Sequence, residues 1–160
     1  ADQAGRSGQN SRVATHLIKR ACQTVLGVLP HMDVFGEDYG TPDGTCVRDY
    51  IHLTDLARAH VAVLDQIVGT GRNVTLNCGY GHGFSVREVL DVVDRVPADT
   101  LGAAAMIRRS GPRRAGDPAS LIADTARIRK TLNWQPEYDD LSVMAATALA
   151  WEKQLLDGMD

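Results

Sequence analysis

Arginine is the residue type whose number and placement point most directly to chemistry in this sequence. The chain has 14 arginines and only 3 lysines, and a guanidinium is the better group for planar, two-pronged binding of a phosphate or carboxylate. Four arginines cluster in residues 108–118, RRSGPRRAGDP. Backbone N–H groups of a turn can join such arginines in holding an anion. A solvated charged face is the alternative interpretation of this cluster.

A glycine-rich stretch, GYGHG at residues 79–83, stands between a strand-like and a helix-like segment. That is the setting of a dinucleotide-binding fingerprint, G-x-G-x-x-G. The spacing fails, because the third glycine would fall on Phe84. No strand ending in Asp or Glu follows about twenty residues later, as the fingerprint requires. We therefore favour a structural strand-to-helix turn over a phosphate-binding loop.

Other catalytic constellations are missing from the sequence. The five histidines lack metal-ligand spacing, there is no G-x-S-x-G, and no tyrosine is followed by lysine four residues later. Such a lysine would lower the pKa of a tyrosine base. The three cysteines, Cys22, Cys46 and Cys78, include no CxxC pair, which argues against a disulfide framework or zinc ribbon. We predict no catalytic and no metal-ligating residue here, and a reducing, cytoplasmic setting.

The elements that must position these residues alternate between helices and short strands, which predicts an α/β or α+β fold. The apolar spacing and the caps predict helices over 13–29, from a cap at Thr54, from a capping box at 85–88, over 124–132 and over 141–156. Strand-like segments are 32–35, 48–53 and 73–78, whereas 36–46 is a loop and 97–114 is irregular. About three strands are too few for a complete doubly wound sheet.

Length and composition indicate one globular domain, residues 1–160. The chain has a mass of 17.3 kDa, 44% apolar and 23% charged residues and a net charge of −3. An acidic balance argues against duplex nucleic acid as a partner. No run of 18 apolar residues could span a membrane. Residues 1–12 are all small or polar, so we expect the chain to be part of a longer protein.

Several segments closely resemble UDP-glucose 4-epimerases. The most specific are DGTCVRDYIHLTDLARAH at 43–60 and GPRRAGDP at 111–118. The segments FGEDYGT at 35–41, LNCGYGHGFSV at 76–86 and NWQPEY at 133–138 continue the resemblance in the family's order. It runs from about residue 15 to residue 154.

The resemblance implies that this chain is the C-terminal, substrate-binding part of an extended short-chain dehydrogenase/reductase. The family's N-terminal Rossmann half, with its NAD fingerprint and catalytic residues, would lie outside the chain. That half also forms the family's homodimer. The helix from Thr54 and segment 73–78 would pack against it, so Val61, Val63, Val74 and Leu76 would lack a partner within this chain.

The resemblance also implies which residues bind the UDP moiety. Arg48 and Arg114 match the family's diphosphate arginines, and Asp117 matches its ribose-binding aspartate. The complete set is Leu17, Phe35, Arg48, Tyr50, Arg114 and Asp117, with His16 as a further candidate where the family has asparagine. A family tyrosine is replaced by Leu121, and the unusual stretch 97–107 could displace Arg114.

The expected activity is that of the whole enzyme. Such an enzyme interconverts UDP-glucose and UDP-galactose by NAD-dependent removal and return of a hydride at C4, and this chain alone is expected to be inactive. A stand-alone nucleotide-sugar-binding module or a decayed gene product is the alternative. The parent could also be a 4-epimerase for UDP-N-acetylglucosamine or a dehydratase, although the VRDYIH and GPRRAGDP motifs count against a dehydratase.

Overall fold

The computed structural model describes residues 1–11, 13, 15–98, 105–132 and 134–158, and within them lie five helices and five short strands. The helices are α1 (Leu17–Val25), α2 (Leu53–Thr70), α3 (Val86–Ala98), α4 (Ala126–Leu132) and α5 (Leu141–Asp157). The strands are β1 (Met32–Phe35), β2 (Val47–Arg48), β3 (Phe84–Ser85), β4 (Arg108–Gly111) and β5 (Ser120–Leu121). The predicted α/β fold with short, mixed strands is confirmed, with five strands rather than about three.

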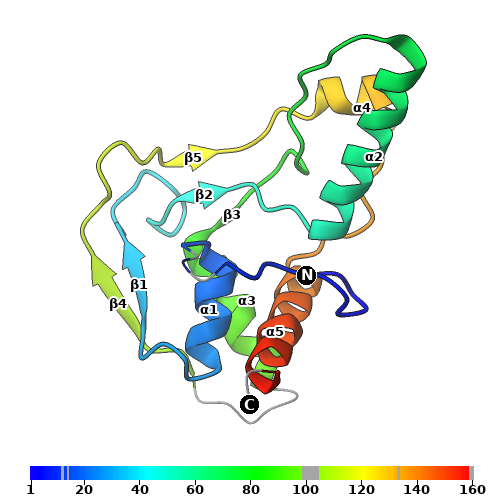
Figure 1. Ribbon diagram of the computed structural model, residues 1–160. Helices are drawn as coiled ribbons and strands as arrows, with labels where there is room; N and C mark the ends of the chain where they lie inside the picture. Colours follow the sequence, from blue (N-terminus) through cyan, green and yellow to red (C-terminus); the bar gives the residue numbers. More distant parts are fainter. Residues whose placement is uncertain (12, 14, 99–104, 133, 159–160) are drawn as a thin grey trace.

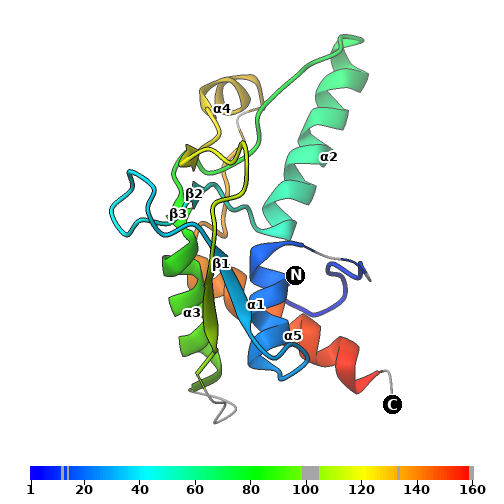
Figure 2. The same cartoon turned by 90° about the vertical axis from the view of Figure 1, so that its left-hand side faces the viewer.

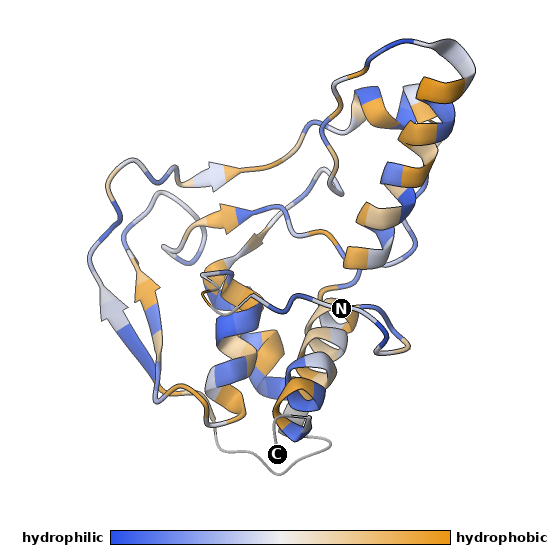
Figure 3. Ribbon diagram, viewed as in Figure 1, coloured by the Kyte–Doolittle hydropathy of each residue, from blue (hydrophilic) through white to orange (hydrophobic). Residues whose placement is uncertain are grey.

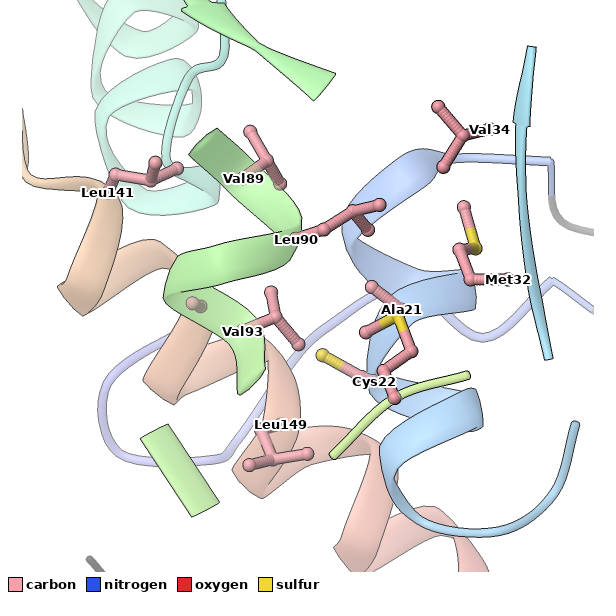
Figure 4. Close-up of a cluster of buried hydrophobic side chains, with 11 residues drawn as sticks. Ala21, Cys22, Met32, Val34, Val89, Leu90, Val93, Leu141 and Leu149 are labelled. Atoms are coloured by element: carbon pink, nitrogen blue, oxygen red, sulfur yellow. The ribbon is translucent and has the colours of Figure 1, made fainter. Parts of the chain in front are cut away.

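The main body is formed by α1, α3 and α5, which pack against one another beside β1 and β4 (Figure 1). Their facing apolar side chains make the principal core (Figure 4). Its buried members are Ala21, Cys22, Met32, Val34, Val89, Leu90, Val93, Met106, Leu141, Ala145 and Leu149. Because three helices contribute to it, this core holds the body together without α2 or α4.

Two small sheets join segments that are far apart in the sequence. β1 pairs in parallel with β4, from Met32 opposite Arg108 to Phe35 opposite Gly111. β2 is the middle strand of the other sheet, antiparallel to β3 and parallel to β5. The prediction of an irregular segment over 97–114 is therefore wrong at 108–111. The residues of β4, RRSG, show no apolar alternation, so only their pairing with β1 makes them a strand.

The start of α3 follows the predicted capping box. Glu88 N donates to Ser85 Oγ over 3.0 Å, and Ser85 N donates to Glu88 Oε2 over 2.7 Å. Both bonds satisfy N–H groups that the first helical turn leaves without partners. This prediction is confirmed, and it fixes the point at which β3 turns into α3.

Two other helix starts differ from the prediction. α1 begins only at Leu17, because His16 has an extended backbone, and Gly27 with φ 75° follows its end. α2 is capped by His52 rather than by Thr54: the His52 Nδ1 accepts the Thr54 N–H over 3.2 Å. Histidine lies outside the usual capping residues, so the sequence favoured the wrong one.

Asp55 in the first turn of α2 is the centre of a buried polar cluster. Its side chain is 0% exposed and accepts hydrogen bonds from Tyr80 Oη at 2.8 Å and from the backbone N–H groups of Glu137 and Tyr138 at 3.0 and 2.8 Å. Burial raises the pKa of Tyr80, so its hydroxyl keeps the proton that it donates. Asp55 thereby ties α2 to the segment before α5 and to the glycine-rich turn.

The helix α2 projects away from the main body with α4 beside it (Figures 1 and 2). A second, smaller core of Ala59, Ile128 and Trp134 joins these elements. Hydrophobic residues nevertheless recur along the projecting helix (Figure 3), and Val61, Leu64 and Val68 are exposed. The prediction that Leu76 lacks a partner is wrong, because it packs against the second core.

The predicted strand at 73–78 is not formed. These residues have no secondary structure, and none of the described strands pairs with them. A strand needs a neighbour to satisfy its backbone groups, whatever the residue pattern. The apolar alternation of NVTLNC is therefore present without the partner that would make it a strand.

We expect Asp55→Ala to lower the free energy of unfolding by about 3 kcal/mol, because it leaves buried N–H and O–H donors without an acceptor. Asp65→Ala, at an exposed site on the same helix, is the matched control and should change stability little. Urea denaturation of both variants measures the difference. Equal transition midpoints would show that the buried cluster does not hold α2.

Candidate functional site

A cleft of about 340 Å³ opens between α1, β1, β2 and the turn after β4. Its walls include six residues that the sequence singled out, and these come from distant parts of the chain: Leu17, Phe35, Arg48, Tyr50, Arg114 and Asp117. The unusual stretch 97–107, of which 99–104 lie outside the described residues, does not keep Arg114 from this cleft. The binding role of the six remains a prediction, but their proximity is a property of the fold.

His16 is set apart from these six. It lines an adjoining cavity of about 650 Å³, which shares Leu17, Arg48 and Tyr50 with the cleft. The His16 Nδ1 atom contacts the side-chain amide of Gln9, so its ring is engaged with the N-terminal segment. His16 can therefore act only at the border of the cleft.

Arg48 is held in the middle strand of the three-stranded sheet. Its guanidinium donates to the backbone oxygens of Val47 and Pro118 over 2.6 and 2.8 Å and forms an ion pair with Asp117. The two paired side chains are 22% and 31% exposed. Ion pairs with such access to solvent contribute little to stability, about 1 kcal/mol or less. A dianionic ligand can therefore compete with Asp117 for Arg48.

Arg114 lies over the ring of Phe35, with its guanidinium carbon 4.0 Å from the ring centroid. It forms no ion pair with any carboxylate of the described residues. A Cβ on Gly111 would lie 3.2 Å from Phe35 Cδ1, so this glycine lets β4 pass close to the ring. Phe35 and Arg114 thus present an aromatic face and a cation at one place in the cleft.

The other arginines of the 108–118 cluster have partners. Arg108 forms ion pairs with Asp91 and Asp94, and Arg113 forms one with Asp38 and stacks on Tyr39. Arg109 Nη1 lies 3.4 Å from His31 Nε2. The solvated-face interpretation therefore suits most of the cluster, and the anion-binding interpretation suits Arg114.

Tyr50 contributes a neutral hydroxyl to the cleft. Burial raises the pKa of this phenol to about 12, although the nearby Arg48 acts in the opposite direction. The group therefore keeps its proton at neutral pH. It can donate a hydrogen bond to a ligand oxygen but cannot act there as a base.

The glycine-rich turn at 79–83 binds a carboxylate of the protein itself. The Asp49 side chain accepts from the N–H groups of Tyr80, Gly81 and Ala123 over 3.2, 3.3 and 3.2 Å. A Cβ on Gly79 would lie only 2.4 Å from Asp49 Oδ2, which explains the need for glycine there. The Tyr80 and Gly81 N–H groups thus support a structural role for this turn, although the strand predicted before it is not formed.

Metal and thiol chemistry find no support in the described part of the chain. It contains no group of three His, Cys, Asp or Glu side chains that could hold a metal ion. Cys22, Cys46 and Cys78 are free. Burial raises the pKa of the Cys22 thiol to about 12, which leaves it unreactive at neutral pH.

Two charged residues of the cleft were missed from the sequence, Arg20 and Asp33. A signal for both exists in the spacing. Arg20 follows Leu17 by three residues in a helix, and Asp33 precedes Phe35 by two residues in a strand. A spacing of three in a helix places Arg20 on the same side of α1 as Leu17. A spacing of two in a strand places Asp33 on the same side of β1 as Phe35.

Comparison with known proteins gives consistent results. The sequence model of a family described as GDP-mannose 4,6-dehydratase matches residues 4–146. A UDP-glucose 4-epimerase of Azospirillum brasilense is 49% identical over 155 residues, which cover 97% of this chain and 43% of the relative. In the described part of the chain, none of the helices has the length and apolar character needed to cross a bilayer.

Solved structures also match nearly all of this chain and less than half of their own length. A crystal structure of a UDP-glucose 4-epimerase is similar over 98% of this chain and 46% of its own, with a TM-score of 0.90 and 38% identity. The UDP-glucose 4-epimerase of Bifidobacterium longum in complex with NAD+ and UDP matches over 99% of this chain and 45% of its own, with a TM-score of 0.85 and 35% identity. The chain thus spans less than half the length of these relatives, and the match lies in their C-terminal part.

Proposed function

Since this chain belongs to the family described as GDP-mannose 4,6-dehydratase, we propose that it is the part of a UDP-glucose 4-epimerase that anchors the UDP moiety of the substrate. The observation that carries the proposal is the single cleft lined by Leu17, Phe35, Arg48, Tyr50, Arg114 and Asp117. Arg114 in the same cleft has no carboxylate partner among the described residues, and its guanidinium is stacked on the Phe35 ring.

The chemistry of UDP suits this cleft. A diphosphate carries about two negative charges, and charge-assisted hydrogen bonds from Arg48 and Arg114 would contribute about 1.5–3 kcal/mol each. Release of Asp117 from Arg48 would free its carboxylate to accept the ribose hydroxyls. The Tyr50 hydroxyl can donate to a phosphate or ribose oxygen. Leu17 and Phe35 offer apolar surface to the uracil ring.

NAD is the cofactor that the epimerase reaction requires, and the glycine-rich turn of this chain does not suit its pyrophosphate. The N–H groups of Tyr80 and Gly81 in this turn are bound to the Asp49 carboxylate, whose charge would repel a pyrophosphate. We propose that NAD and the catalytic groups belong to an N-terminal Rossmann half of the parent enzyme, which also forms a homodimer. The three free cysteines suit a cytoplasmic protein.

The face of α2 formed by Val61, Leu64 and Val68, here called the α2 face, is the surface we propose for contact with the Rossmann half. These residues are spaced by three and four, so they lie on one side of the helix, and all are exposed. Segment 73–78 would pair with a strand of that half and so complete its backbone hydrogen bonds. Both features call for a partner that this chain does not supply.

The anchoring role predicts different effects for two adjacent arginines. We expect Arg114→Ala to weaken binding of UDP by about 10- to 100-fold, because a charge-assisted bond to the diphosphate is lost. Arg113→Ala is the matched control, since Arg113 is paired with Asp38 outside the cleft. Isothermal titration of UDP into the two variants measures this. Equal affinities, or no binding to the unsubstituted chain, would refute UDP anchoring.

The proposed assignment of NAD to the other half predicts that this chain alone does not convert UDP-glucose into UDP-galactose, even with NAD+ supplied. A chromatographic assay for UDP-galactose checks this, with a complete UDP-glucose 4-epimerase as the positive control. Formation of UDP-galactose by the chain alone would overturn the division of labour between the two halves.

The α2 face predicts strong binding of a hydrophobic dye such as anilinonaphthalene sulfonate. Joint replacement Val61→Gln, Leu64→Gln and Val68→Gln should lower the dye fluorescence at least about twofold, since it removes the three exposed apolar side chains that form one contiguous face of α2. Val13→Gln, at an isolated residue that is 87% exposed, should have little effect. Weak dye binding by the unsubstituted chain would argue against an uncovered interface.

A further inference from the structure

His52, the residue that caps α2, has both of its ring nitrogens engaged inside the protein. It is 2% exposed, and its Nδ1 accepts the Thr54 N–H over 3.2 Å. The other ring nitrogen, Nε2, lies 3.2 Å from Thr147 Oγ1 on α5. Thr147 Oγ1 itself donates to the backbone oxygen of Val143 over 2.9 Å, so it accepts from His52. The hydrogen bonds therefore assign a neutral ring with its proton on Nε2.

This ring lies where α2 joins the main body. The first residues of α2 and its cap, 52–55, are here called the root of α2. The bond from His52 to Thr147 links the root to α5, and the His52 N–H donates to Tyr80 Oη over 3.1 Å. The ring also stacks on Tyr138 with 4.6 Å between the centroids. Beyond the root, α2 projects away from the main body (Figures 1 and 2).

A second proton on this ring is incompatible with the cap. A protonated imidazole carries N–H groups on both nitrogens. The Nδ1–H would then face the Thr54 N–H, so two donors would oppose each other and the capping bond would be lost. Turning the ring over gives the same conflict, because both nitrogens donate. Serine, threonine and asparagine cap helices without gaining a proton near neutral pH, whereas histidine gains one there.

The charged groups around His52 act on its ring in both directions. The titratable groups that contact it or line the cavity beside it are Ala1, Asp2, Lys19, Arg48, Asp49, Asp55, Tyr80, Tyr138 and Glu152. Burial is the largest influence and lowers the pKa of His52, and the Ala1 amino group acts in the same direction. The carboxylates of Asp55 and Asp2 act in the opposite direction and do not outweigh burial. The folded chain thus favours the neutral ring.

We propose that His52 is a pH-sensitive attachment of α2, which holds the root on the main body while the ring is neutral and releases it when the ring is protonated. The α2 face would then lose its fixed position, and contact with a Rossmann half would weaken on acidification. That consequence rests on the proposed function. The attachment itself involves residues of this chain alone and does not depend on UDP binding or on a partner.

Amide hydrogen exchange followed by NMR on this chain tests the proposal. Because folding lowers the pKa of His52 from its ordinary value of 6.5, the released root binds the proton better, so attachment is fully stable above pH 6.5 and weakens below it. After correction for intrinsic exchange, opening at the Thr54 N–H should rise about 3- to 10-fold from pH 7.5 to 5.5. Its opening free energy should stay below that of Leu90 in the main core, which marks local release rather than global unfolding.

Two variants of α2 identify the group responsible. His52→Asn keeps a capping side chain that does not titrate, so it should abolish the pH response while the helix remains capped at pH 7.5. His60→Asn, at an exposed histidine of the same helix, is the matched control and should keep the response. An NMR titration of the His52 ring in the unsubstituted chain should give a midpoint below 6.5, and it tests the proposal even if His52→Asn fails to fold.

Three results would refute the attachment: a pH response that persists in His52→Asn, a ring midpoint at or above 6.5, or an unsubstituted chain whose Thr54 opening is the same at both pH values. Equal opening free energies at Thr54 and Leu90 would refute local release. All of these measurements are made without nucleotide or partner. Failure of this proposal therefore leaves UDP anchoring and the contact with a Rossmann half to be judged by their own experiments.

Discussion

The pairing of β2 with both of its neighbours is the constraint on which the cleft depends. Val47 N donates to Ala119 O over 2.8 Å, and Val86 N donates to Cys46 O over 2.9 Å. These bonds join the segment around Arg48 to the turn that carries Arg114 and Asp117 and to the start of α3. The strand has only two residues, so its position comes from its neighbours. This backbone pairing brings Arg48 beside the turn before β5, where it forms its ion pair with Asp117.

Internal carboxylates decide which cations and amides are open to a ligand. Asp38 occupies Arg113, and Asp91 and Asp94 occupy Arg108. Asp49 fills the glycine-rich turn, the feature that most resembled a phosphate loop. Arg114 is instead covered by an aromatic ring, which leaves its N–H groups directed elsewhere. A chain with a net negative charge can thus offer an anion site. Its carboxylates pair with neighbouring arginines such as Arg108 and Arg113, and Arg114 is left without a carboxylate partner among the described residues.

The sequence was informative where structure is local. The capping box at Ser85 and the apolar periodicity of α5 follow from neighbouring residues alone, and both are present in the structure. β4 was missed because it becomes a strand only through pairing with β1, and the cap at His52 because the Asp55 cluster holds that segment. The six cleft residues were found through resemblance to a family. Nothing in their spacing would have brought Leu17 next to Asp117.

Apolar side chains are buried in the main body but partly exposed on α2. The main body buries its own core among α1, α3 and α5, and its α1 and β1 form two walls of the cleft. The helix α2 instead has a small core on one side and the exposed α2 face on another. The cleft can therefore form from this chain alone, whereas the exposed α2 face and the unpaired segment 73–78 agree with the proposed contact to a partner half. This arrangement suits an enzyme in which one half holds the nucleotide and the other acts on the sugar.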